Sequence, residues 1–271
     1  MAPPRRPQLT SPEPGWVIEI TDDQSRTLVD VNTDVSYHSR CGAAAECDHV
    51  YRNNGGFSQE DGDSATSQWP ATILEIGLGT GLSMLRTLDH AVANDCPLRY
   101  ISVEVAPLKT ETLRQLDLGR GLRHPELVEE YLRLYEEHIE PLRTVEGDAA
   151  DKQELRLGEQ HPLPRVNWTP SVNRHVEIIV GNAVDFLARE DVLVDTVYLD
   201  AFDPKTSPEL WTVGFLQTLA EKIRPGGRLV TYCVASEIRR RMESAGFSVQ
   251  RVPGPPGGKR EVMIALRSAA D

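Results

Sequence analysis

Three glycines in the first half of the chain have the spacing of a ligand-binding loop. Gly77, Gly79 and Gly81 follow the apolar run ILEI and open a segment with helical periodicity. A bare turn between a strand and a helix lets a ligand approach backbone amides at the edge of a sheet. Leu82 stands where dinucleotide-binding proteins place their last glycine, so the loop favours a ligand without a diphosphate.

S-adenosylmethionine is such a ligand, and acidic residues near the loop suit its charged groups. Glu75 is the last polar residue before the loop, where an ionised carboxylate needs a partner such as the ligand's ammonium. Glu104 ends the next apolar run, where an acid accepts hydrogen bonds from ribose hydroxyls. Asn182 follows the third run, where it suits either contact with adenine or a helix N-cap. The alternative is that the glycines form only a tight turn and Glu104 is a surface acid.

The stretch VYLDAFDPKTSPELW contains the main candidate for a catalytic residue. Asp200 ends an apolar run, and the chain continues through Ala201 to Lys205 before a helix begins near Pro208. The carboxylate is therefore expected beside the crevice that holds the cofactor. We expect it to align an amine for in-line attack on a methyl group, because an ordinary Asp, with a pKa of about 3.9, is a poor base toward an ammonium. The alternative for Asp200 and Asp203 is turn and cap chemistry.

Strands that alternate with helices must position these residues. Seven runs are typical of strands, namely TILEI, YISVEV, VEIIVG, TVYLDAF, RLVTYCV, FSVQRV and EVMIALR. Helical patterns cover residues 81–94, 108–119, 125–139, 183–190, 208–223 and 236–246. The alternation predicts an α/β protein with a mostly parallel sheet that helices cover on both faces.

The last two runs decide the type of sheet. FSVQRV and EVMIALR are joined by a loop too short for a crossover helix, so the last strand should run antiparallel to its neighbour. A seven-stranded, Rossmann-like sheet with a reversed last strand is the arrangement of class I S-adenosylmethionine-dependent methyltransferases. A plain dinucleotide-binding sheet does not need the reversal.

Composition divides the chain into three parts. Residues 1–15 contain five prolines and are expected to be a disordered arm. Residues 16–68 begin with a predicted β-hairpin, continue with a short Ala-rich helix and end in a polar linker. Residues 69–271 form the predicted methyltransferase domain, with an insertion of unassigned structure at 144–175.

Composition and charge exclude several classes of protein. No run of about 20 apolar residues indicates a transmembrane helix, and the N-terminus lacks the apolar segment of a secretory signal, so we expect a cytoplasmic protein without a membrane partner. Four scattered cysteines without a CxxC pair predict neither a metal site nor a disulfide framework. With a net charge of −12, the chain must hold any nucleic acid by a local basic patch.

Several of these stretches together resemble a known family. LEIGLGTGLS, ISVEVAPL, LDAFDPKTSPELWT, RPGGRLVTY and KREVMIAL occur in the order found in the methyltransferase domain of MnmC-like tRNA wobble-uridine modification enzymes. YHSRCGAAAECDHVY is similar to their N-terminal segment, and the resemblance runs from Trp16 to Arg267. It implies methyl transfer from S-adenosylmethionine to the aminomethyl group of 5-aminomethyl-(2-thio)uridine at the tRNA wobble position. It also implies a stand-alone form, whose substrate a separate oxidoreductase would supply.

The resemblance implies roles for individual residues. Those that would bind the cofactor are Glu75, Gly77, Gly79, Gly81 and Glu104. Those that would shape the nucleoside pocket or pack near it are Phe202, Pro204, Lys205, Tyr37, Ser39 and Arg40. Asp200 would face the amine.

A local basic patch is predicted at the rim of the site. Because the last strand is reversed, its first residues should lie at the same edge as the carboxyl ends of the parallel strands. Lys259 and Arg260 are therefore expected beside Lys205. Three cations at this edge would hold phosphates of the anticodon stem-loop of tRNA.

Other activities share parts of this pattern. An aminopropyltransferase of the spermidine-synthase kind has the same fold, but its glycine loop usually carries an aspartate after paired glycines, which GLGTG lacks. A small-molecule N- or O-methyltransferase would use the same cofactor pocket with another acceptor. The presence of Glu75, Glu104 and Asp200 argues against a binding protein with a vestigial site.

Overall fold

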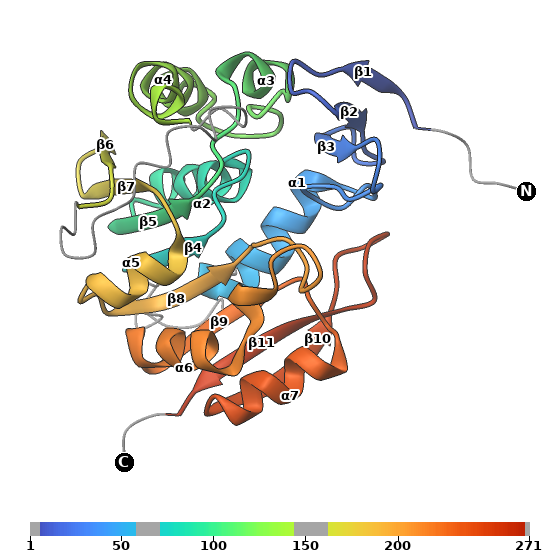
Figure 1. Cartoon of the computed structure of the whole chain (residues 1–271). Helices are drawn as coiled ribbons and strands as arrows, with labels where there is room; N and C mark the ends of the chain where they lie inside the picture. The colour runs from blue at the N-terminus through green and yellow to red at the C-terminus, as the bar shows by residue number, and fades with distance from the viewer. Residues whose placement is uncertain (1–5, 58–70, 144–161, 269–271) are drawn as a thin grey trace, which may run out of the picture.

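An eight-stranded sheet forms the centre of the molecule. The computed structural model of the chain describes residues 6–57, 71–143 and 162–268. The strands in spatial order are β10 (Phe247–Pro253), β11 (Glu261–Arg267), β9 (Ile223–Thr231), β8 (Val194–Leu199), β4 (Thr72–Ile76), β5 (Leu98–Glu104), β7 (Arg174–Val180) and β6 (Arg165–Ser171). Figure 1 shows these strands between two groups of helices.

The middle of the sheet is parallel and brings the predicted site residues to one edge. β9, β8, β4, β5 and β7 pair in parallel, and β4 is buried along its whole length, as expected for a strand covered on both faces. Beyond the strand ends, the Gly77 amide donates to the Val103 carbonyl at 3.0 Å, and the Asp200 amide donates to the Ile76 carbonyl at 3.0 Å. The residues that follow β4 and β8 are thereby held side by side.

The sheet confirms the class I methyltransferase arrangement and adds one strand to it. β11 runs antiparallel to both β9 and β10, so the predicted reversal of the last strand is correct. The extra strand, β6, lies in the segment 144–175 that had no assigned structure, and it pairs antiparallel with β7 at the edge of the sheet. The prediction of seven strands missed β6 because RVNWTPS has a single buried residue, Trp168, and lacks an apolar run.

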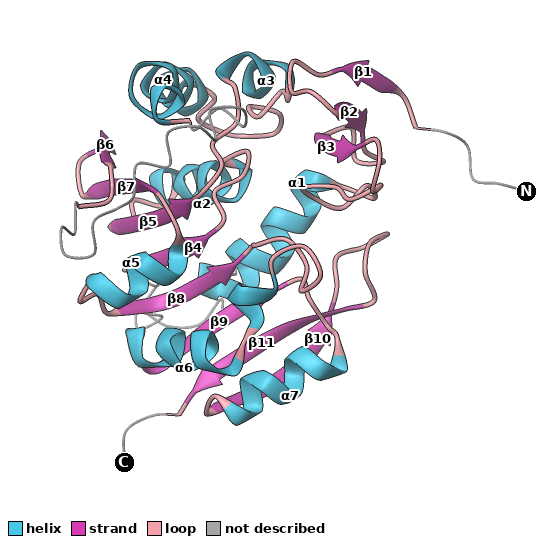
Figure 2. Cartoon of the chain, in the orientation of Figure 1, coloured by secondary structure: helices cyan, strands magenta, loops and turns pink. Residues whose placement is uncertain are grey.

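Helices cover both faces of the sheet, as Figure 2 shows. One face carries α2 (Leu82–Ala93), α3 (Thr110–Gln115) and α4 (Glu126–Leu134), which continues as the short helical turns η2 (Tyr135–Ile139) and η3 (Glu140–Leu142). The other face carries α5 (Ala183–Arg189), η4 (Pro208–Trp211), α6 (Val213–Lys222) and α7 (Ser236–Ser244). Alternate residues of β4 serve the two cores, since Ile73 belongs to the first and Leu74 and Ile76 to the second.

A smaller antiparallel sheet precedes the main one. It consists of β1 (Gln8–Thr10), β2 (Trp16–Ile20) and β3 (Arg26–Asp30), of which β2 and β3 are the predicted hairpin. The prediction of a disordered arm over residues 1–15 is wrong for 8–10, which pair with β2 as β1. Composition missed this strand because its stability comes from main-chain pairing with an exposed strand edge, which a proline-rich sequence does not reveal.

The N-terminal extension shares its hydrophobic core with the main sheet and its helices. After the small sheet, the chain forms α1 (Ala43–Glu46) and the π-helical segment η1 (Cys47–Phe57), in the predicted helical region. Val50 and Tyr51 of η1 are buried in the same cluster as Ile73 of β4 and Leu85 of α2. The extension is therefore packed as part of the fold that carries the glycine loop.

Some predictions concern residues outside the described ranges. The polar linker falls largely on 58–70, and the first part of the insertion falls on 144–161. Within the described ranges, the helices are too short or too polar for any of them to cross a membrane.

Candidate active site

A cavity opens at the carboxyl ends of β4, β5, β7 and β8. Its volume is about 470 Å³, within the range of small-ligand sites. Seven of the predicted site residues line it, namely Tyr37, Gly77, Gly79, Glu104, Asn182, Asp200 and Phe202. Apolar side chains such as Val103 and Leu210 complete the wall, so the cavity combines a polar backbone edge with surfaces for a ring.

The glycine loop needs glycine for two separate reasons. Gly77, Gly79 and Gly81 all have positive φ values, of 93°, 53° and 78°, in the left-handed region that other residues rarely adopt. A Cβ atom on Gly77 would lie 2.9 Å from the backbone oxygen of Asp200, and one on Gly81 would lie 2.5 Å from the Tyr131 hydroxyl. The bare loop therefore permits close packing of β4 against β8 as well as access to the cavity, and Gly81 itself is not part of the cavity wall.

Glu104 is fastened to the glycine loop by its carboxylate. Its Oε2 atom accepts from the Gly79 amide at 2.8 Å, and its Oε1 atom accepts from the Ala106 amide at 2.7 Å. Burial raises the pKa of Glu104, and these backbone hydrogen bonds oppose the rise. Each carboxylate oxygen keeps a second lone pair, so the group can still accept hydrogen bonds from hydroxyls of a ligand.

Asn182 caps a helix at the cavity wall. Its Oδ1 atom accepts from the Val184 amide at 2.7 Å, at the N-terminus of α5. The helix-capping alternative therefore accounts for its side-chain oxygen. The side-chain NH₂ group is left to serve a ligand in the cavity, which Asn182 lines.

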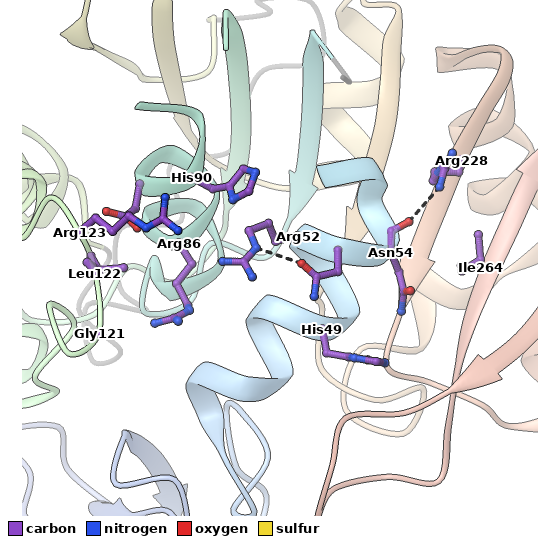
Figure 3. A pocket seen from close by; sticks show the side chains of 12 residues that line it. His49, Arg52, Asn54, Arg86, His90, Gly121, Leu122, Arg123, Arg228 and Ile264 are labelled. Carbon is purple, nitrogen blue, oxygen red and sulfur yellow. Dashed lines mark hydrogen bonds between the residues drawn. The ribbon is translucent and has the colours of Figure 1, made fainter. Parts of the chain in front are cut away.

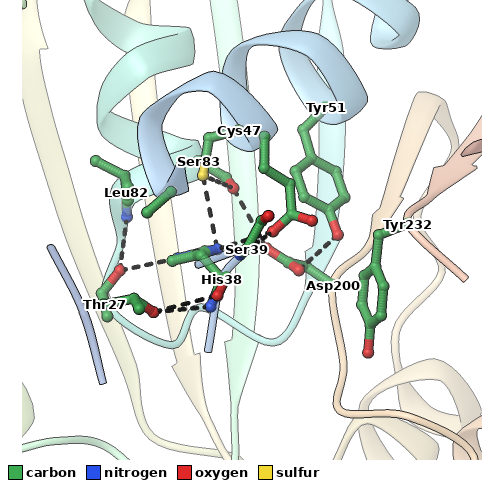
Figure 4. Close-up of polar contacts among 12 residues, drawn as sticks. Thr27, His38, Ser39, Cys47, Tyr51, Leu82, Ser83, Asp200 and Tyr232 are labelled. Atoms are coloured by element: carbon green, nitrogen blue, oxygen red, sulfur yellow. Dashed lines mark hydrogen bonds and ion pairs between the residues drawn. The ribbon is translucent and has the colours of Figure 1, made fainter. Parts of the chain in front are cut away.

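Asp200 carries a carboxylate held by two hydroxyl donors. Figure 4 shows Tyr51 of η1 and Ser83 of α2 converging on it. The Tyr51 hydroxyl donates to Oδ1 at 2.5 Å, and the Ser83 hydroxyl lies 3.3 Å from Oδ2. Burial raises the pKa of Asp200 well above its usual range, and the negative charge of Glu46 adds to this rise. The two hydroxyl donors and the charge of Lys259 act in the opposite direction.

A chain of polar side chains extends from Asp200 to the glycine loop. The Ser83 hydroxyl is also 3.3 Å from the Cys47 thiol, which lies 3.7 Å from Nδ1 of His38. The other ring nitrogen of His38 lies 3.2 Å from the Thr80 hydroxyl in the glycine loop. Burial lowers the pKa of His38 to about 4, so its imidazole is neutral at physiological pH.

Aromatic rings form the outer wall of the cavity. Tyr37 packs edge-on against Phe202 with ring centroids 5.0 Å apart, and Trp16 of β2 packs against both rings. The Trp211 indole NH donates to the Phe202 carbonyl at 2.9 Å and holds this turn in place. The small N-terminal sheet thereby contributes to the same wall as the turn after β8.

Two cations of the predicted basic patch flank this wall without lining the cavity. Lys259 lies over the ring of Tyr232, with its Nζ atom 4.0 Å from the ring centroid, and Tyr232 lines the cavity. Lys205 is exposed in the turn after β8, one residue before the cavity-lining Thr206. Arg260 is exposed next to Lys259, and Pro204, next to Lys205, is partly buried.

Two residues predicted near the pocket instead support the N-terminal extension. The Arg40 guanidinium donates to Glu19 at 2.9 Å and to Asp34 at 2.8 Å, so its charge is used within the extension. The Ser39 amide donates to the buried carboxylate of Glu46 at 2.7 Å. The sequence pattern placed both residues correctly in the segment near the pocket but could not show which way their side chains point.

Glu75 is fully buried in β4 and does not line the cavity. The Ser102 hydroxyl of the neighbouring strand donates to its Oε2 atom at 2.7 Å. Burial raises the pKa of Glu75 well above its usual range. The carboxyl group is therefore enclosed in the core behind the glycine loop, and this placement differs from the predicted direct partner of a ligand ammonium.

We expect Glu75→Gln to make the stability of the protein less dependent on pH. The buried carboxyl favours folding fully below the pKa of the unfolded chain, about 4.3, and this contribution is lost as the pH rises through the higher pKa of the folded state. In that window the wild type should lose about 1.4 kcal/mol of unfolding free energy per pH unit from this group, whereas the variant should not. Urea unfolding at pH 5 and pH 8 gives the unfolding free energy of both proteins at the two pH values. An equal change in unfolding free energy between these pH values in the two proteins would contradict the assignment.

Comparisons with known proteins agree with this geometry. The profile of a family described as S-adenosyl-L-methionine-dependent methyltransferase matches residues 160–268. A tRNA 5-methylaminomethyl-2-thiouridine biosynthesis bifunctional protein MnmC from Ectopseudomonas mendocina is 32% identical over 235 residues, which are 84% of this chain and 31% of that protein. The protein of the same name from Pseudomonas fluorescens is 30% identical over 261 residues, or 95% of this chain and 35% of that protein. The chain contains an MnmC-like methyltransferase domain.

A solved structure supports the same fold for the MnmC-like domain. MNMC2 from Aquifex aeolicus superimposes with a TM-score of 0.68 and 24% identity, covering 96% of this chain and 73% of that one. The chain spans about a third of the length of the curated relatives that it matches. The resemblance noted in the sequence is confirmed, and S-adenosylmethionine is the cofactor in the description of the matched family.

Sequence reasoning missed several residues of the MnmC-like site. Tyr51 and Ser83 hold the Asp200 carboxylate, and His38 and Tyr232 line the cavity. Tyr51 lies in CDHVYRNN, which predicted only a helix, and Ser83 is the second residue of the helix after the glycine loop. The role of Tyr51 depends on the approach of η1 to the end of β8, a contact between residues 149 positions apart. The role of Ser83 depends on the approach of α2 to the same carboxylate, 117 positions away.

Proposed function

We propose that this chain transfers a methyl group from S-adenosylmethionine to the aminomethyl nitrogen of 5-aminomethyl-(2-thio)uridine at the tRNA wobble position. The observation that carries the proposal is the partly buried carboxylate of Asp200, which opens onto the same cavity as the glycine loop and Glu104. A carboxylate beside the methyl donor can orient an amine acceptor, and the position of Asp200 suits it to this role. The names of the relatives, which refer to tRNA 5-methylaminomethyl-2-thiouridine biosynthesis, support the choice of acceptor.

The cavity fits the cofactor in size and in the chemistry of its walls. The Glu104 carboxylate, already oriented by two backbone amides, is placed to accept from ribose hydroxyls. Ala106, Leu210 and the Asn182 amide surround the region where a purine would lie. When bound, S-adenosylmethionine supplies an electrophilic methyl group on a positively charged sulfur. Asp200 and Glu104, which line the cavity, would provide negative charge that suits a cationic cofactor when they are ionised.

Asp200 is suited both to orient the amine and to receive its proton. The nitrogen must present its lone pair in line with the carbon–sulfur bond, and a hydrogen bond to a fixed carboxylate restricts it to that direction. As the new carbon–nitrogen bond forms, the nitrogen becomes positively charged and must lose a proton. The sequence alone favoured orientation without proton removal, because an ordinary Asp is a weak base. Burial raises the pKa of Asp200, so its carboxylate is a stronger base than that interpretation assumed.

Tyr51→Phe should shift the pH dependence of methyl transfer. The Tyr51 hydroxyl stabilises the ionised form of Asp200, so its removal raises the pKa of that carboxyl further. Activity requires the ionised carboxylate, and the acidic limb of the kcat/KM profile should therefore move to higher pH, with little loss at alkaline pH. Tyr135→Phe, in a buried tyrosine of η2, is the matched control. An unchanged profile in Tyr51→Phe would show that Asp200 is not the titrating group.

Methylation of tRNA tests the proposed function directly. The protein would be incubated with radiolabelled S-adenosylmethionine and tRNA that carries 5-aminomethyluridine or its 2-thio form, and the tRNA would then be digested to nucleosides. We expect the label in the 5-methylaminomethyl nucleoside. Transfer to free polyamines with none to tRNA would overturn the proposal.

The proposal also names the partners and the compartment. The anticodon stem-loop of tRNA would approach the rim that holds Lys205, Lys259 and Arg260. The aminomethyl substrate would come from an oxidoreductase, and the reaction would take place in the cytoplasm with the tRNA. Mass analysis of tRNA nucleosides from cells that lack this protein should show the aminomethyl form accumulating.

A further inference from the structure

A second cavity lies on the face of the sheet that α2 and η1 cover. Its volume is about 670 Å³, and it is walled by η1, α2, the loop at residues 121–123 and the strands β9 and β11. Figure 3 shows Arg52, Arg86 and Arg123 on one side and Arg228 on the other. None of the residues that line it belongs to the cavity at the carboxyl ends of the strands.

Positive charge dominates this second cavity in a chain whose net charge is −12. Its basic lining residues are Arg52, Arg86, Arg123, Arg228, His49 and His90. The acidic lining residue is Asp89, whose Oδ1 atom accepts from the His124 amide at 2.7 Å. One further acid, Asp48, pairs with both Arg52 and Arg86. Four guanidinium groups thus face two carboxylates.

Two of the arginines make no ion pair with the residues that the structure describes. Arg123 is exposed at the rim and contacts no carboxylate within the described ranges. Arg228 is partly buried, and its Nη1 atom donates to the Asn54 carbonyl at 3.3 Å. Arg86, whose side chain is 11% exposed, has a buried Nε atom without a hydrogen-bond partner in that same part of the chain. The guanidinium groups of these arginines therefore have N–H donors available for an acceptor in the cavity.

The positive potential acts on a titratable neighbour. The pKa of His90 is lowered to about 4, first by burial and then by the charges of Arg52 and Arg123. An anion placed among these side chains would offset the repulsion. The planar guanidinium group matches the geometry of phosphate oxygens, and arginine clusters are a common means of binding phosphate.

We propose that this arginine-lined cavity binds backbone phosphates of the RNA substrate, outside the anticodon contacts at the active-site rim. The inference rests on the proposed tRNA methyltransferase function. The cavity draws residues from five parts of the chain, and its volume of about 670 Å³ is larger than a single phosphate needs. It is also joined to the active site by η1, which presents Arg52 to the cavity and the adjacent Tyr51 to Asp200.

Binding of tRNA by Arg123→Ala and by the double variant Arg123→Ala/Arg228→Gln tests the inference. Arg123 is exposed, so its removal should leave the fold intact, and an unchanged affinity for S-adenosylmethionine verifies this. We expect about a tenfold loss of tRNA affinity in the double variant. The slope of log K for tRNA binding against log[salt] should become shallower by about 0.7 to 0.9 for each phosphate contact that is lost. Arg240→Ala, an exposed arginine of α7 on the opposite face, is the matched control and should behave as the wild type.

A parallel titration with tripolyphosphate separates RNA from a small anion as the ligand. Loss of tripolyphosphate binding in the variants with unchanged tRNA affinity would overturn the inference and indicate a small-anion site. An unchanged affinity and salt slope for tRNA would also overturn it, while methylation of tRNA by the wild type would leave the proposed function standing. If the wild type neither binds nor methylates tRNA, both the proposed function and this inference fail.

Discussion

Asp200→Asn should lower the rate of methyl transfer by about 10²- to 10⁴-fold, the range typical of a lost general base. The amide has the shape of the carboxylate and still accepts a hydrogen bond from Tyr51, but it cannot accept the proton that leaves the nitrogen. Under the proposed function, the glycine loop and Glu104 would hold the cofactor, so cofactor affinity should remain nearly unchanged. Single-turnover kinetics and calorimetric titration with S-adenosylmethionine measure the two quantities.

Asp203→Asn is the matched control for this prediction. The Asp203 carboxylate accepts from the amides of Lys205 at 2.7 Å and Thr206 at 3.2 Å, so it shapes the turn after β8. Its replacement by an isosteric amide should have a small effect on the rate. Comparable losses in both variants would show that the turn, and not the Asp200 carboxylate, sets the activity.

Gly77→Ala should damage both stability and activity. At φ 93° a side chain costs about 1–2 kcal/mol of unfolding free energy, and a Cβ atom 2.9 Å from the Asp200 carbonyl must also push the end of β8 away. Overpacking of this kind adds about 1–3 kcal/mol. A displacement near 1 Å at the reacting groups lowers rates by about 100-fold, so we expect a loss of that size in the folded variant.

Gly246→Ala separates backbone strain from the collision. Gly246 has φ 94°, nearly the value of Gly77, and an added Cβ atom would meet nothing within 4 Å. This variant should lose only about 1–2 kcal/mol of unfolding free energy, which is the cost of a side chain in the left-handed region. It should keep full activity. Urea unfolding and methylation assays on both variants give the comparison, and equal losses of stability would refute the close contact between Gly77 and Asp200.

The N-terminal extension takes part in the site. Tyr37 and His38 line the main cavity, and Tyr51 donates to the Asp200 carboxylate. Because Val50 and Tyr51 are buried together with Ile73 and Leu85, movement of η1 would disturb the core and the site at once.

The sequence by itself determined the order of the strands and helices and the edge at which the chemistry lies. The glycines follow the run ILEI, Glu104 ends the next run, and Asp200 ends the apolar part of TVYLDAF. The carboxyl ends of these three runs meet at one edge of a parallel sheet. This placement follows from the periodicity of each run and from the pairing rules of parallel strands. The structure accordingly brings Gly77, Glu104 and Asp200 to one cavity.

Only the tertiary structure decided where individual side chains point and which distant residues meet. Glu75 is enclosed behind the loop and Arg40 pairs with Glu19, although their positions in the sequence suited ligand binding. Packing between distant segments creates the hydrogen bond from Tyr51 to Asp200 and raises the pKa of that carboxyl. It also brings together the four arginines of the second cavity, Arg52, Arg86, Arg123 and Arg228. The local sequence pattern predicts which positions are buried and which are exposed. Hydrogen bonding and desolvation depend on neighbours that only the folded chain brings together.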